Sequence, residues 1–114
     1  MIKNIASAEH YTWGGVCDGW RLLARPDLSV IQERIPPGAG EVRHYHDRAR
    51  QLFFVLQGQL EVQVEDETFV LGAADSVEVS AGARHRVRNT ASQDASFLVI
   101  SAPDTVGDRV DVAE

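Results

Sequence analysis

Apolar and polar residues alternate over short segments of this chain, and glycines and prolines separate the segments. Residues 60–64, Leu-Glu-Val-Gln-Val, alternate strictly, which predicts a strand with one buried and one solvent-facing side. No segment carries the 3.6-residue apolar period of an amphipathic helix, so the pattern predicts an all-β domain. Other segments of strand length, rich in β-branched or aromatic residues, are 28–35, 51–56, 69–71, 76–79, 85–89 and 97–100.

Two short polar segments predict chain reversals between these strands. Residues 65–68, Glu-Asp-Glu-Thr, lie between alternating flanks as in a hairpin turn, and Gly58 between two glutamines indicates a tight reversal. About seven or eight short strands with frequent turn signals are typical of a β-sandwich or barrel. Segment 2–13 has the weakest pattern and fits either a short helix or an arm.

Length and composition narrow the class of protein. A chain of 114 residues with 44% hydrophobic and 25% charged residues is expected to be one folded domain. The net charge of −6 argues against a general nucleic-acid binder, and no apolar run is long enough for a membrane helix. The single cysteine, Cys17, excludes an intramolecular disulfide and a cysteine zinc site. We therefore expect a cytoplasmic protein without nucleic-acid or membrane partners.

Three of the four histidines fall in two neighbouring β segments. His44 and His46 are two residues apart, so in an extended segment both side chains lie on one face. His85 begins another predicted strand. Buried imidazoles need partners, and a transition metal is a common one, so the three histidines indicate a metal site. The alternative for the first two alone is a pair of surface histidines on an edge strand.

Glycines at fixed distances from these histidines resemble the two motifs of the cupin superfamily. In the first motif, five residues separate Gly38 from His44-x-His46, four separate His46 from Gln51, and six separate Gln51 from Gly58. The second motif includes Gly72 and then Ser80-x-Gly82-x-x-His85-x-x-x-Asn89. The resemblance extends over residues 28–101 and to the C-terminal segment around Gly107-Asp-Arg109.

This resemblance implies an all-β, RmlC-like jelly-roll barrel (double-stranded β-helix) of two antiparallel sheets with a metal inside. The barrel is expected over residues 28–114, with 1–27 as an N-terminal arm and first strands that contact a second copy in a homodimer. The implied cofactor is a divalent transition metal, whether zinc, iron, nickel, manganese or copper. Its implied ligands are His44, His46, Gln51 and His85.

Two positions depart from the family pattern, and one of them changes the expected chemistry. Ser80 stands where the second motif usually has proline, and Gln51 stands where the first usually has glutamate. Three imidazoles and an amide leave a divalent metal with its full charge, whereas a glutamate would lower that charge by one. Alternatively, Gln51 hydrogen-bonds a water or a neighbour and leaves a three-histidine site.

The alternation of side chains along a strand predicts which of the arginines near the motifs face outward. If His85 faces inward, Arg84, Arg86 and Arg88 face outward and pair with acidic residues; Arg43 likewise opposes His44. One of Arg48 and Arg50 is a candidate for the rim of the site. Cys17 is expected to be a small buried residue. The aromatic residues of the N-terminal segment are expected to form a lid or to pack at a barrel end or a subunit interface: His10, Tyr11, Trp13 and Trp20. The core or pocket wall is expected to contain Phe53, Val55, Leu60, Val62, Val64, Val87 and Leu98.

Two functions remain open from the sequence. The first is a metal-dependent enzyme, such as a dioxygenase, isomerase or lyase, that acts on a small polar or anionic molecule. The second is a barrel that binds or senses a small ligand without turnover, which the motifs favour slightly because they place no general acid or base beside the ligands. A purely structural role is disfavoured, because three converging imidazoles are a costly core.

Overall fold

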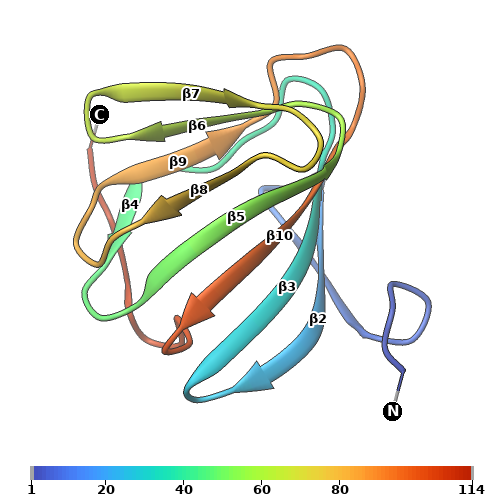
Figure 1. Cartoon of the computed structure of the whole chain (residues 1–114), viewed down its shortest axis with the longest axis horizontal. Helices are drawn as coiled ribbons and strands as arrows, with labels where there is room; N and C mark the ends of the chain where they lie inside the picture. The colour runs from blue at the N-terminus through green and yellow to red at the C-terminus, as the bar shows by residue number, and fades with distance from the viewer. Residues whose placement is uncertain (1, 114) are drawn as a thin grey trace.

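Strands account for most of the structure, a computed structural model that describes residues 2–113 (Figure 1). These residues form two antiparallel sheets. In spatial order, the six-stranded sheet consists of β1 (Glu9–Trp13), β2 (Cys17–Arg25), β3 (Leu28–Ile35), β10 (Ala95–Ala102), β5 (Arg50–Gln57) and β8 (Ser76–Val79). The five-stranded sheet consists of β11 (Arg109–Asp111), β4 (His44–His46), β9 (His85–Arg88), β6 (Leu60–Val64) and β7 (Glu67–Leu71).

The core lies between the two sheets, because the buried faces of both contribute to one apolar cluster. In β10 every second residue is buried, as the period of two requires for a strand with one covered face. The fully buried side chains include Phe97 and Val55 from one sheet and Leu60, Val62 and Val87 from the other. The structure is therefore the expected all-β jelly roll, and Cys17 is buried in it as expected.

The strand predictions are accurate where apolar and polar residues alternate. The segments 28–35 and 76–79 are strands with those bounds, and Glu65 and Asp66 form the turn between β6 and β7. Gly58 reverses the chain between β5 and β6, and it does so at a corner, since the two strands lie in different sheets.

Two expectations about elements are corrected. The N-terminal segment is neither a helix nor a loose arm over its second half: residues 9–13 form β1, which pairs with β2 along its whole length. Leu98 is not in the core; it lies half-buried on the other face of β10, opposite Phe54 and Gln32. Residues 97–100 are all apolar, so alternation could not show which two face inward.

The C-terminal segment is fixed against the loop after β4. The buried carboxylate of Asp108 accepts hydrogen bonds from the backbone N–H groups of Arg48 and Ala49, at 3.1 and 2.9 Å. Burial alone would raise the pKa of Asp108, but these hydrogen bonds outweigh it, and the pKa lies below its ordinary value. The segment then continues as β11 along β4, which brings Arg109 beside His46 in the register.

Candidate metal centre

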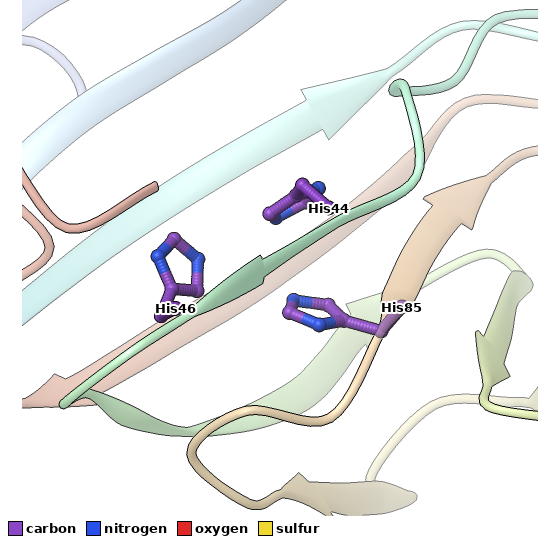
Figure 2. A group of neighbouring side chains, drawn as sticks. All are labelled: His44, His46 and His85. Carbon is purple, nitrogen blue, oxygen red and sulfur yellow. The ribbon is translucent and has the colours of Figure 1, made fainter. Parts of the chain in front are cut away.

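Three imidazoles converge inside the barrel (Figure 2). His44 and His46 project from β4 on the same face, and His85 projects from β9; the register pairs His44 with His85 across the two strands. One nitrogen from each ring lies within 4.8 Å of the others, and all three residues are buried. The pattern His-x-His on one strand and a histidine on its neighbour thus produces the predicted cluster.

Two of the rings are held in the tautomer that a metal requires. Nδ1 of His44 donates to the Val42 carbonyl at 2.8 Å, and Nδ1 of His85 donates to the Ala83 carbonyl at 2.9 Å. The lone pair of each ring is therefore on Nε2. Burial lowers the pKa of His44 to about 3 and that of His85 to about 4, so both rings are neutral at pH 7.

His46 completes a donor set that fits a transition metal. Burial also lowers its pKa, and its Nδ1 is buried without a hydrogen-bond partner among residues 2–113. Three neutral imidazoles with converging nitrogens match the ligand preference of zinc, iron, nickel and copper ions, whereas manganese prefers oxygen ligands. The donor chemistry thus fits the implied cofactor.

Gln51 lies next to this cluster, on β5 of the opposite sheet. Its Oε1 is 3.0 Å from Nε2 of His85, and its Nε2 donates to Ser101 Oγ at 3.0 Å. Since Nε2 of His85 carries the lone pair, two acceptors face each other here. Either a shared cation or a turned amide that donates to the ring resolves this contact. Ligation by Gln51 therefore stays a prediction.

The cluster opens into a cavity of about 230 Å³ between the sheets. This volume is below the range typical for drug-sized ligands, so it suits a small molecule. Polar and apolar side chains both line it: Tyr11, Trp13, Ile31, Glu33, Glu41, His44, His46, Gln51, Phe53, Val99, Ser101, Thr105 and Arg109.

A tyrosine and a glutamate form a hydrogen-bonded pair in this cavity. Tyr11, Gly19 and Glu33 lie side by side on β1, β2 and β3. The ring of Tyr11 lies over Gly19, where an added Cβ would be 2.3 Å from the ring's Cζ. The hydroxyl of Tyr11 donates a hydrogen bond to Glu33 Oε2 at 3.3 Å. Burial raises the pKa of Glu33 to about 7. Burial likewise raises the pKa of Tyr11.

A second carboxyl group is closer to the histidines. Glu41 Oε1 is 4.0 Å from His44 Nε2, and its side chain is 11% exposed. Burial, and secondly the charge of Glu33, raise the pKa of Glu41 to about 8. Arg109 lies at the cavity mouth with Nη1 at 3.8 Å from Glu41 Oε2. Acid–base groups and a cation therefore surround the cluster.

Sequence reasoning found the histidines but missed these three groups. Glu33 had a signal, since it takes an inward position between Ile31 and Ile35 in a predicted strand. Glu41 had none, because its segment has no clear alternation, and the resemblance of the segment around Arg109 to the family indicated no role for that residue. The motifs place no general acid or base beside the ligands, but the fold brings Glu33 and Glu41 into the same cavity.

The arginines near the motifs mostly face outward, as parity predicted. Arg88 pairs with Glu61 at 3.0 Å, and Arg43 approaches Glu65 at 3.9 Å. Arg84 stacks over Tyr45 on the outer face. The expectation that Arg48 or Arg50 reaches the rim is wrong: Arg48 binds Asp108, and neither residue lines the cavity. The arginine that lines it is Arg109.

The aromatic residues of the N-terminal strands separate into two groups. Tyr11 and Trp13 line the cavity. His10 and Trp20 contact each other with ring centroids 5.4 Å apart, and His10 pairs with Asp18 at 2.7 Å. His10 is thus outside the histidine cluster, as expected.

Comparisons with known proteins agree with this geometry. Residues 31–101 match the Cupin domain family. A polyketide synthase protein, CurC of Streptomyces cyaneus, is 33% identical over 67 residues, which cover 59% of this chain and 44% of that protein. The chain thus spans less than half the length of this curated relative.

Solved structures share the fold at low sequence identity. KdgF from a Halomonas species superposes with a TM-score of 0.81 at 21% identity, covering 89% of this chain and 91% of that one. An RmlC-like cupin from Shewanella frigidimarina gives a TM-score of 0.81 at 22% identity, covering 90% and 89%. The described residues contain no helix long and apolar enough to cross a membrane.

Proposed function

This chain belongs to the cupin domain family, and from that premise we propose that it binds a divalent transition metal and acts on a small polar or anionic molecule. His44, His46 and His85 would hold the metal, with Gln51 as the candidate fourth ligand. The observation that carries the proposal is the buried cluster of three neutral imidazoles beside a cavity.

A bound metal would supply Lewis acidity toward an oxygen atom of the substrate. The chain's own residues then have distinct roles. Glu33 is suited to accept or donate a proton near neutral pH, because its pKa of about 7 is close to working conditions. Tyr11 orients that carboxyl group through its hydroxyl, and Arg109 attracts an anionic group at the cavity mouth.

These groups favour an enzyme over a barrel that only binds. Proton transfer by Glu33 suits an isomerase or a lyase, whereas an iron-loaded centre would suit an oxygenase. The alternative, a ligand-binding or sensing barrel, has some support from the rings of Tyr11, Trp13 and Phe53, which line the cavity and suit stacking on a bound molecule.

Metal analysis of purified protein tests the proposal. We expect close to one transition-metal ion per chain after expression without added metal, and a loss of roughly tenfold or more in His46→Ala and His85→Ala. His10→Ala is the matched control, since His10 lies outside the cluster and should leave the metal content unchanged. Full metal content in both cluster variants would contradict the site.

Turnover separates the enzyme from the binding barrel. The metal-loaded protein is incubated with mixtures of small hydroxy acids, keto acids and sugars, and NMR spectra are followed with time. Consumption by the wild type that is lost in Glu33→Gln supports the enzyme. Ligand-induced line broadening without any product supports the binding barrel.

A further inference from the structure

The metal centre lacks a negative charge at the position where the family usually has one. Gln51 offers a neutral amide oxygen, and the three imidazoles are neutral as well. A divalent ion held by these four groups would keep its full charge inside a buried site, which is unfavourable unless an anion lies close by. A search for that anion leads to one side chain.

Glu41 is fixed at the edge of the cluster by β9. Its backbone N–H donates to the Val87 carbonyl at 3.0 Å, and its Oε1 accepts the Val87 N–H at 3.1 Å. This double contact holds the carboxylate two residues along the strand from His85. Oε1 is also the atom that faces His44 Nε2, the nitrogen with the lone pair.

The distance between these two atoms places the carboxylate just outside the cluster of three histidines. Oε1 of Glu41 and Nε2 of His44 are 4.0 Å apart, and zinc binds nitrogen and oxygen at about 2.0–2.1 Å. One tetrahedral ion cannot contact both atoms at this separation, so the carboxylate acts on the ion through its charge or through a further ligand of the ion.

The surroundings of Glu41 contain little other positive charge. Arg109 reaches it at 3.8 Å, and that side chain is 42% exposed and bonds Asp111 at 2.7 Å. Glu33, a second carboxyl group, adds like charge in the same cavity. A buried carboxylate in this position is stabilised by a cation on its histidine side.

We infer that Glu41, rather than the residue at position 51, supplies the carboxylate that neutralises the bound metal. The inference rests on the proposed metal binding and gives a role to Glu41, one of the five unspecified residues between Gly38 and His44 in the first motif. Its role is electrostatic, so it predicts an effect on metal affinity as well as on any reaction.

Cobalt affinity tests the inference without a known substrate. Co²⁺ binding to metal-free protein is measured by calorimetry and by the visible absorption of the bound ion. Glu41→Gln, which keeps an oxygen for the Val87 N–H, should weaken binding by at least about tenfold. Glu33→Gln is the matched control, a carboxyl-to-amide change in the same cavity, and should weaken binding less.

A rescue variant separates charge from structure. Glu41→Gln combined with Gln51→Glu returns one carboxylate to the site and should recover at least half of the lost binding free energy, with circular dichroism confirming the fold. The inference is overturned if Glu41→Gln weakens Co²⁺ binding by less than tenfold, if Glu33→Gln weakens it equally, or if the double variant does not recover it. In each of these cases, Co²⁺ binding by the wild type would still uphold the metal site. A wild-type chain that binds no Co²⁺ overturns both.

Discussion

At the scale of single residues, the sequence was most informative about the histidines, a rare residue type with a distinctive ligand chemistry. His44, His46 and His85 stand at strand positions whose parity is unambiguous, so their convergence followed from spacing and the family motifs together. Glu41 and Gln51 show the limit, because the contact each makes depends on loops and on the opposite sheet. No local pattern encodes such distances.

The carboxyl group of Glu33 should make the stability of the metal-free protein depend on pH. In the unfolded chain it loses its proton near pH 4.5, and in the folded chain near pH 7. Between these values the folded state binds more protons, so the free energy of unfolding falls as the pH rises, by on the order of 3 kcal/mol. Tyr11, Arg109 and Glu41 are the titratable and charged groups around it.

Urea unfolding at pH 5 and pH 8, with a chelator present, measures this effect. Glu33→Gln cannot ionise at this position, so its stability should fall less over the same range. The difference between the two proteins reports Glu33 together with its effect on Glu41, because the charge of Glu33 contributes to the raised pKa of Glu41. Identical pH dependence in the two proteins would show that Glu33 keeps an ordinary pKa.

At the scale of elements, alternation located the strands, and its failures have physical causes. The edge strand β1 is short and its residues are mostly exposed, so little alternation marks it. β10 is apolar on both faces over residues 97–100, which concealed the outward position of Leu98. The corner after β5 was placed correctly because Gly58 is a local signal.

Replacing Gly58, at the corner between the two sheets, should lower the stability of the fold more than replacing Gly15. Its φ is +80°, and a Cβ would lie 2.3 Å from the backbone oxygen of Asp94. Gly58→Ala should lower the free energy of unfolding by about 2–4 kcal/mol through strain and overlap. Gly15, with φ +82° and open space around it, is the matched control at about 1 kcal/mol.

Chemical denaturation of the two variants checks this difference. Equal losses for Gly58→Ala and Gly15→Ala would mean that only the backbone conformation matters and that the Asp94 segment yields to the added methyl group. If Gly58→Ala lowers the free energy of unfolding more than Gly15→Ala does, the added cost comes from the close contact between residue 58 and the backbone of Asp94.

At the scale of the whole molecule, the barrel was predictable from the motifs and the rhythm of strands, whereas the assembly was not. The homodimer expected from the N-terminal strands stays a prediction, and light scattering with sedimentation of the purified protein measures it. A monomer at all concentrations would contradict it. Partner contacts depend on a second chain, about which one sequence carries little information.

Metal binding should stabilise the entire domain. An ion that binds only the folded state at 100 times its dissociation constant adds about 2.7 kcal/mol, which for a domain of this size raises the melting temperature by roughly 10 °C. Differential scanning calorimetry with metal and with a chelator measures the shift. His85→Ala should show no shift, and a shift of wild-type size in that variant would place the ion elsewhere.

The pairing of His44 with His85 means that a bound metal would connect two strands that are distant in the sequence. An ion held by these residues would link positions roughly 40 residues apart in the sequence, and it would do so only in the folded state, because the unfolded chain does not hold the imidazoles together. Cys17 has no partner with which to form a covalent bridge. The ion would therefore act as a reversible cross-link between strands distant in sequence, one that a chelator removes.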